Sequence, residues 1–210
     1  MIVLIGSQKG GCGKSTIATN LAAVAAQKGR DVVLIDSDAQ CTSATWAADR
    51  EETSAPQVAC VQRVGNITAT AKELARKYDL VLIDAGGRDS QELRTGLLAA
   101  DVVIAPFKPS QADLDTVFQL SDVITQAQDF NPALTALAVL TMSPTHPANT
   151  EIKDARDYLK KHLKVASCLL HDRKAYRDAL SMGRGVIEHN DPKAKTEINK
   201  LYKVMNNANK

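Results

Sequence analysis

The sequence predicts an α/β fold, in which helices cover both faces of a mainly parallel, twisted sheet. Three observations lead to this prediction. Short apolar runs alternate along the chain with longer stretches of helical periodicity. The apolar runs do not alternate with polar residues, which is typical of strands covered on both faces. Glycine and proline separate the elements. The 210 residues suit a single domain over residues 1–210.

The elements follow in order from these patterns. Strands are predicted over residues 2–5, 32–35, 80–83, 102–105 and 137–140. Helices are predicted over residues 14–28, 66–77, 90–99, 112–128 and 150–162, and two more near 173–182 and 193–206. Residues 49–57 are polar and poorly patterned, which predicts a loop. Strand alternating with helix favours a parallel sheet.

Charge is spread unevenly along the chain. The net charge is +2, but residues 1–150 hold 12 Lys and Arg against 16 Asp and Glu, a balance of −4. Residues 151–210 hold 14 against 8, a balance of +6. The basic C-terminal part predicts either a solvated face on the last helices or a surface for a polyanion such as DNA.

The cysteines and the N-terminus indicate where in the cell we expect the protein. The four cysteines, at positions 12, 41, 60 and 168, include no C-x-x-C pair, so a zinc or iron–sulfur site has little support. A reduced cytoplasmic setting fits them best. The chain starts directly with a strand pattern and no secretion signal. Its apolar runs are shorter than the roughly 18–20 residues that span a bilayer, so we expect no membrane insertion.

A glycine-rich segment, QKGGCGKST, joins the first predicted strand to the first predicted helix. Glycines let a backbone approach phosphate oxygens closely, and the amides at a helix start attract anions. Lys14 would then contact the β- and γ-phosphates, and Ser15 would bind Mg²⁺. The segment departs from G-x-x-x-x-G-K-[ST], because Gln8 holds the first glycine position. The predicted nucleotide-binding residues are Gly10, Gly11, Cys12, Gly13, Lys14, Ser15 and Thr16.

Acidic residues end two of the predicted strands. Asp36 and Asp38 follow the second strand, and Asp84 follows the third. Ligands bind outside the carboxyl ends of strands in open α/β sheets, so all three belong at the ligand-binding edge. Asp84 fits the acidic segment that holds a Mg²⁺-bound water in phosphate-loop ATPases. Helix capping or a turn remains the alternative role for Asp36 and Asp38.

The pattern K-G-G-x-G-K-[ST]-T resembles that of the deviant phosphate-loop ATPases, which include ParA partition proteins, MinD proteins and nitrogenase iron proteins. The resemblance implies a P-loop NTPase fold and a second lysine, here Lys9, that contacts nucleotide across a dimer interface. It also implies that Asp38 positions the attacking water and that Asp36 supports either the Mg²⁺ shell or the lysine. A solvated surface lysine is the alternative for Lys9.

Later segments extend the resemblance to ParA proteins. Residues 106–113 are similar to P-x-x-P-S-x-x-D, although Ser110 also suits a simple helix cap. Thr141 and Met142 would lie near adenine, although Met142 suits the core equally. Residues 85–88 would sense the γ-phosphate, but they lack the proline that many relatives have in this stretch. Arg88 suits a switch or interface role and an ordinary exposed position equally. The C-terminal pattern implies non-specific DNA contacts, with Arg173, Lys174, Arg177 and Arg184 as candidates.

The sequence as a whole favours a small ParA-type partition ATPase without an N-terminal helix-turn-helix. Such a protein would dimerise on MgATP, bind nucleoid DNA, and hydrolyse ATP slowly until a ParB-type partner stimulates it. A MinD-like membrane-cycling ATPase is the alternative, because Ile198, Leu201, Tyr202 and Met205 form a helical stripe; core packing explains that stripe equally. An iron-protein-like reductase needs two cysteines after Asp84, and only Cys168 lies there.

Overall fold

The computed structural model describes residues 1–146 and 150–208 and contains a seven-stranded sheet. The strand order is β3-β2-β4-β1-β5-β6-β7, and every neighbouring pair runs parallel. The strands are β1 Ile2–Ser7, β2 Val32–Ser37, β3 Ala59–Gln62, β4 Leu80–Gly87, β5 Val102–Phe107, β6 Thr135–Ser143 and β7 Val165–His171. The parallel α/β fold is thereby confirmed.

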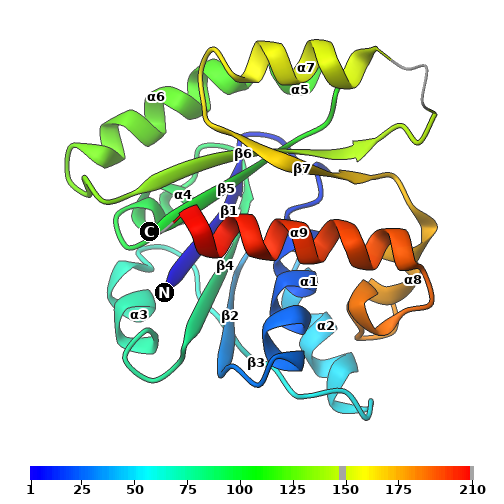
Figure 1. Ribbon diagram of the computed structural model, residues 1–210. Coiled ribbons are helices and arrows are strands. Elements are labelled where there is room, and N and C mark those ends of the chain that lie inside the picture. The colour runs from blue at the N-terminus through cyan, green and yellow to red at the C-terminus, as the bar shows by residue number, and fades with distance from the viewer. Residues whose placement is uncertain (147–149, 209–210) are drawn as a thin grey trace.

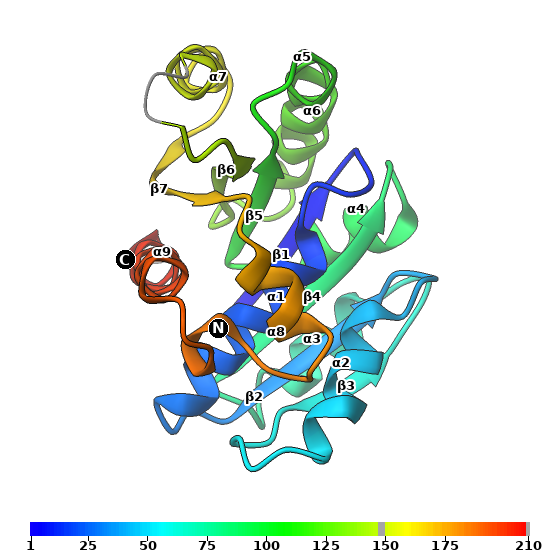
Figure 2. The ribbon, with the colours of Figure 1, turned by 90° about the vertical axis from the view of Figure 1, so that its right-hand side faces the viewer.

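Helices cover the sheet on both faces (Figure 1; Figure 2). Helices α1 Lys14–Gln27, α2 Thr42–Glu51, α8 Lys174–Leu180 and α9 Pro192–Ala208 share one core. Helices α3 Thr68–Leu74, α4 Gln91–Leu97, α5 Gln111–Leu114, α6 Val117–Gln128 and α7 Glu151–Leu159 pack in the other. Side chains of β1 alternate between them: Val3 and Ile5 point into the first core, Ile2 and Leu4 into the second. This two-sided burial explains the uninterrupted apolar runs.

The structure adds two strands and one α-helix that the sequence pattern did not predict. They are β3 and β7, which are the two edges of the sheet, and α2. Residues 49–51, expected in a loop, form the last turn of α2. The helix expected over 112–128 is divided into α5 and α6. A short 3-10 turn, Val186–Glu188, precedes α9.

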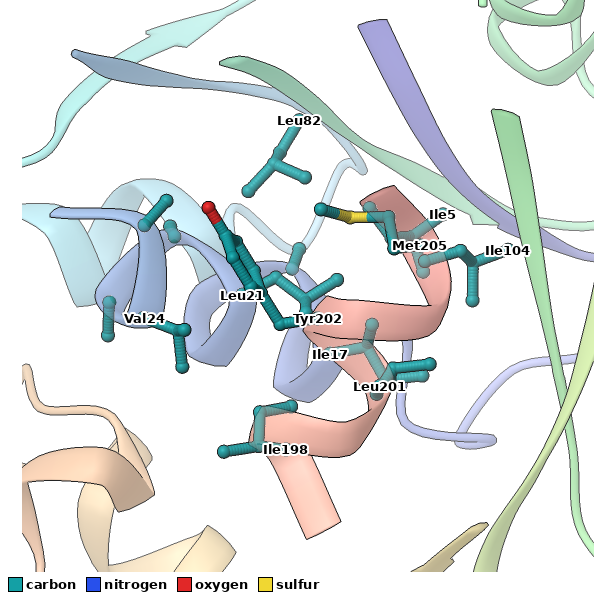
Figure 3. Close-up of a cluster of buried hydrophobic side chains, with 14 of the residues drawn as sticks. Ile5, Ile17, Leu21, Val24, Leu82, Ile104, Ile198, Leu201, Tyr202 and Met205 are labelled. Atoms are coloured by element: carbon teal, nitrogen blue, oxygen red, sulfur yellow. The ribbon is translucent and has the colours of Figure 1, made fainter. Parts of the chain in front are cut away.

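The apolar stripe of α9 belongs to the core. Ile198, Leu201 and Met205 are fully buried, and Tyr202 is 6% exposed. Figure 3 shows these side chains against those of α1 and of the central strands, including Ile17 and Leu82. Core packing therefore accounts for the stripe, and the stripe offers no apolar face to a membrane while α9 stays docked. Among the described helices, none combines the length and apolar character needed to cross a bilayer.

A buried arginine connects α2 to the segment before α9. Arg50 is fully buried, and its guanidinium makes hydrogen bonds of 2.7 and 3.0 Å to the Glu188 carboxylate. It also donates to the carbonyl of Gly183 over 3.0 Å. Gly185 has no room for a side chain, because a Cβ there would collide with Ala23 of α1. The G-x-G-x-x-E pattern of this segment thus serves close packing of α1, α2 and the 3-10 turn.

Candidate nucleotide site

The glycine-rich loop lies between the end of β1 and the start of α1. Gly11 and Gly13 have φ angles of 70° and 92°, a conformation that favours glycine. A Cβ at Gly87, the last residue of β4, would lie 3.0 Å from the Gly10 amide nitrogen, so the end of β4 needs a glycine where it meets this loop. The Thr141 hydroxyl at the end of β6 donates to the Cys12 carbonyl over 2.8 Å. Neighbouring strands therefore hold the loop in shape.

A cleft of about 450 Å³ opens in front of this loop. Lys14 reaches it from the start of α1, and its Nζ donates to the Lys9 carbonyl over 3.2 Å. The cleft is lined by Gly10, Gly11, Gly13, Lys14, Ser15, Thr16, Asp38, Gln40, Thr42, Gly87, Arg88, Met142 and Leu180. Cys12, the remaining predicted loop residue, turns its buried thiol toward the Lys9 carbonyl instead. A helix start with backbone amides and a lysine suits a bound anion.

Asp84 has an unmet oxygen beneath the cleft. The carboxylate is fully buried, and Oδ2 accepts a 2.7 Å hydrogen bond from the Ser43 hydroxyl. Oδ1 makes no well-formed hydrogen bond within the described residues. Burial raises the pKa of Asp84 to about 6, against the opposing effect of the Ser15 and Ser43 hydroxyls, while the nearby Asp36 charge raises it further.

This donor set fits Mg²⁺ bound partly through phosphates and water. Mg²⁺ usually takes one or two protein oxygens and completes its shell with phosphate and water oxygens. Ser15 lines the cleft, and the unpartnered oxygen of Asp84 lies beside it. Among the described residues, three or more His, Cys, Asp or Glu side chains do not gather into a cage for a metal.

Asp36 and Asp38 have different surroundings. Asp36 lies opposite Asp84 in the β2–β4 register, and its two oxygens accept the backbone amides of Asp38, over 3.1 Å, and Ala44, over 2.8 Å. Burial raises the pKa of Asp36 despite these hydrogen bonds. Its carboxylate therefore fixes the β2–α2 connection, as the capping alternative expects. Asp38 lines the cleft and packs beside Gly86.

Lys9 does not line the cleft that Lys14 enters. Its Nζ lies 3.1 Å from Oδ2 of Asp113, and its side chain is 38% exposed. Asp113 is buried at the start of α5 and also accepts hydrogen bonds from the Ser110 hydroxyl, over 3.0 Å, and the Lys108 amide. Ser110 occupies the N-cap position of α5, but its side chain bonds Asp113 rather than a backbone amide. The lysine and the P-x-x-P-S-x-x-D segment are thus joined within one chain.

A smaller cavity of about 150 Å³ adjoins the cleft beside β6 and β7. Its lining shares Gly13, Thr16 and Met142 with the cleft. Met142 is placed there by an extra residue in β6, between the pairs Leu140–Leu169 and Ser143–His171, and has a φ of 45°. The other lining residues are Thr141, Leu170, His171, Asp172, Arg173, Tyr176 and Arg177, and of these seven the sequence pattern suggested only Thr141, the neighbour of Met142, for nucleotide binding.

Comparison with known proteins places the chain in a family. The model of the "CobQ/CobB/MinD/ParA nucleotide binding domain" matches residues 3–186. The chain belongs to this nucleotide-binding family. It is 28% identical over 187 residues to "Maintenance of carboxysome distribution protein A" of Halothiobacillus neapolitanus, covering 88% of this chain and 85% of that protein. It is 29% identical over 167 residues to "Chromosome-partitioning ATPase Soj" of Thermus thermophilus, covering 66% and 67%.

Solved structures of ParA/MinD-like proteins have the same fold. The structure of Cyanothece apo McdA superposes with a TM-score of 0.81 at 16% identity, covering 97% of this chain and 98% of that one. The cell division ATPase MinD of Pyrococcus furiosus superposes with a TM-score of 0.76 at 18% identity, covering 98% of both chains. The P-loop NTPase-type fold expected from the sequence is confirmed.

The four predicted DNA-contacting residues of this ParA/MinD-family chain are not equivalent. Arg173 is 16% exposed in its side chain and makes a two-pronged contact of 2.7 and 2.9 Å with Glu197. Lys174 and Arg177 are exposed but ion-paired, with Asp178 and Asp172. Arg184 is exposed, and its carbonyl accepts the Trp46 indole N–H.

The contact with Glu197 separates Arg173 from the other three candidates. An arginine held by a largely buried carboxylate has a structural partner that a DNA phosphate would have to replace. Exposed ion pairs are weak, about 0–1 kcal/mol, and exchange readily. Lys174, Arg177 and Arg184 are therefore more accessible to a DNA phosphate than Arg173 is.

Proposed function

We propose that the chain is an ATP hydrolase that dimerises on binding MgATP, binds DNA without sequence preference and positions a cargo on the nucleoid. The observation that carries the proposal is the division between two lysines of one loop. Lys14 lines the cleft of its own chain, whereas Lys9 is not part of that lining and keeps its side chain 38% exposed beside Asp113. A lysine so placed suits the nucleotide of a facing subunit.

The proposed catalytic roles follow from the cleft. Transfer of a phosphoryl group to water needs positioning and charge stabilisation rather than covalent chemistry. Lys14 would bind the β- and γ-phosphates, Lys9 of the second copy would add a positive charge, and Asp38 would orient the water. Mg²⁺, held through Ser15 and the shell around Asp84 and Asp36, would neutralise charge on the phosphates.

The adjoining cavity is proposed to take the adenine base. Met142 stands where the cavity meets the phosphate cleft, and the walls nearby include Leu170 and Tyr176. A flat aromatic base suits such apolar walls. Met142→Ala should weaken ATP binding without changing the preference of the phosphate cleft for Mg²⁺.

Slow intrinsic hydrolysis and a stimulating partner complete the proposal. Among the described residues, one arginine, Arg88, lines the cleft. It is exposed, follows two glycines and has a φ of 95°. An exposed side chain on such a loop is not held at the transferred phosphate, which favours a low basal rate. A ParB-type partner would then order the site and release the dimer from DNA.

The cargo is proposed from the relatives. Soj is named as chromosome-partitioning, and the Halothiobacillus protein is named for carboxysome distribution. Both names describe spatial distribution of a large object in a cell. We therefore propose a positioning role, in which the cargo is a plasmid, a chromosome region or a protein body. A MinD-like membrane cycle lacks its main support, because the α9 stripe is buried.

The test is DNA binding by the wild type and Lys14→Ala with ATP, ADP or no nucleotide, over a salt series. ATP should promote binding by the wild type only, and affinity should fall steeply with salt, because released counterions drive phosphate contacts. Binding to anionic liposomes instead of DNA would favour the membrane cycle. Lys9→Ala should weaken ATP-dependent dimerisation in sedimentation, and an unchanged dimer would refute its proposed role.

A further inference from the structure

Strand β7 is an edge of the sheet, and a groove runs along its outer side. The groove has a volume of about 480 Å³ and lies between β7 and the first half of α9, which Figure 2 shows in gold and red. Among the described strands, β7 pairs only with β6. Ser167, Cys168 and Leu169 form one wall of the groove, and Pro192, Thr196 and Lys200 lie on the other.

The ladder pattern fixes which backbone groups face the groove. The Ala138 amide donates to the Lys164 carbonyl, and the Asp172 amide donates to the Ser143 carbonyl. In a parallel ladder these bonds turn the backbone groups of the residues between them, Val165 and His171, away from β6. Leu169, the partner of Leu140, belongs to the same alternating set as Val165 and His171. Ser167 lies between Val165 and Leu169, where β7 has two more residues than β6, and alternation along β7 places it in this set too.

One outward amide already has a partner, and it comes from α9. The His171 N–H donates to the Glu197 carboxylate over 3.2 Å. The same carboxylate also contacts Arg173 and the His171 ring, so its negative charge is already paired within this cluster. Glu197 thus acts as an acceptor at one end of the groove, in the place where a further strand would put a carbonyl.

The charged groups on the groove wall that lie outside this cluster are positive. Lys193 and Lys200 both line the groove and are exposed, and neither takes part in a described ion pair. They lie seven residues apart on α9, so they project on the same side of the helix, two turns apart. The groove therefore offers strand backbone on one wall and two free ammonium groups on the other.

We propose that this groove binds an extended acidic segment of a partner protein, which adds to β7 as an eighth strand. Outward backbone groups at Ser167 and Leu169 would pair with the backbone of the segment. Alternate side chains of an extended segment point the same way, so acidic residues at every second position would face Lys193 and Lys200.

Lys193 and Lys200 could instead serve either of two simpler roles. Lysines beside an edge strand also deter unwanted pairing between sheets, and in that case nothing should dock there. Lysines also bind DNA phosphates. A peptide is favoured over DNA because the lysines flank a groove walled by strand backbone and apolar atoms of Leu169 and Pro192, which phosphates do not use.

The experiment selects from a library of random ten-residue peptides with the full chain as bait. We expect sequences with acidic residues at alternating positions and few prolines. Lys193→Glu with Lys200→Glu should weaken a selected peptide at least tenfold at low salt, while Lys203→Glu should not, because this exposed lysine of the same helix lies outside the groove. Selection without such sequences, or equal loss in both variants, overturns the proposal.

Two readouts separate strand addition from simple charge attraction. Bound peptide should slow hydrogen exchange at the Ser167 and Leu169 amides. N-methylation of every second peptide amide removes alternate hydrogen-bond donors. It should abolish binding when the methylated amides are those that face β7, and leave binding intact when they face away. Unchanged exchange at β7 overturns the proposal, and so does a double variant that loses DNA binding but keeps the peptide. Neither outcome depends on ATP hydrolysis, so the proposed function is tested separately.

Discussion

The ion pair between Lys9 and Asp113 gives a quantitative prediction about dimerisation. In the monomer Lys9 is held by Asp113 of its own chain, and it must leave that partner before it can reach the nucleotide of another subunit. Asp113→Asn removes the charge but keeps an oxygen for the Lys108 amide and a group that can bond the Ser110 hydroxyl. The variant should therefore dimerise more tightly with MgATP than the wild type.

The magnitude follows from the exposure of the pair. With side chains 38% and 5% exposed and 3.1 Å between the charged atoms, the pair lies between a surface and a buried ion pair. A contribution of about 1 kcal/mol is reasonable for such a pair. A symmetric dimer releases two lysines, which gives about 2 kcal/mol, or about thirtyfold in the dimer dissociation constant.

Sedimentation equilibrium with ATP and Mg²⁺ measures this constant. Asp115→Asn is the matched control, because it removes the same charge two residues further along at an exposed position. Asp113→Asn should tighten the dimer while Asp115→Asn leaves it unchanged. If Asp113→Asn dimerises no better than Asp115→Asn, the pair does not restrain Lys9 and the reasoning is refuted.

Three further predictions concern stability and the site. Burial raises the folded-state pKa of Asp84 from 3.8 to about 6, so the folded protein keeps this proton to a higher pH than the unfolded chain does. The unfolding free energy of the nucleotide-free protein should therefore fall by about 2–3 kcal/mol as pH rises from about 4 to about 6. Asp84→Asn should flatten this pH dependence in thermal denaturation. Arg50→Leu should cost about 3–5 kcal/mol in urea denaturation by leaving Glu188 buried and unpaired, and Arg50→Leu with Glu188→Leu should recover much of that loss. Thr141→Val should remove the hydrogen bond to the Cys12 carbonyl and weaken ATP binding by about fivefold in calorimetry, for a loss of about 1 kcal/mol; unchanged affinity would show that the loop needs no such support.

The fold could be predicted for the middle of the sheet and not for its edges. Strands β1, β2, β4, β5 and β6 are covered on both faces, so each contains an uninterrupted apolar run. Edge strands are covered less: β3 is exposed or half-buried throughout, and β7 alternates buried with more exposed residues. Their patterns are therefore weaker than those of the central strands.

Helix α2 was missed for a different reason. Its sequence contains Asp49, Arg50 and Glu51, and it starts after Cys41, which has a φ of 51° and no glycine to signal the turn. The helix is stabilised by contacts from distant parts of the chain, chiefly Arg50 with Glu188 and the Trp46 indole with the Arg184 carbonyl. A sequence window of ordinary length contains neither partner.

The site shows the same limit. Local spacing brought out the glycine loop, Lys14 and the acids at the strand ends, because each belongs to a short motif. The partners of Lys9 and Arg173 could not be found that way, since Asp113 and Glu197 lie 104 and 24 residues away in the chain. Charge counting alone suggests Arg173 for DNA and cannot reveal that the fold pairs it with Glu197.

The position of Asp38 depends on helix α2, which follows it and is anchored at both of its ends. Asp36 binds the Ala44 amide at the start of α2, and at the other end of this helix Arg50 is fixed to Glu188. A helix anchored at both ends cannot shift one end alone, because its backbone hydrogen bonds resist stretching. Movement of the Asp38 loop around a nucleotide must therefore either stay within residues 38–41 or carry α2 and the Glu188 turn with it.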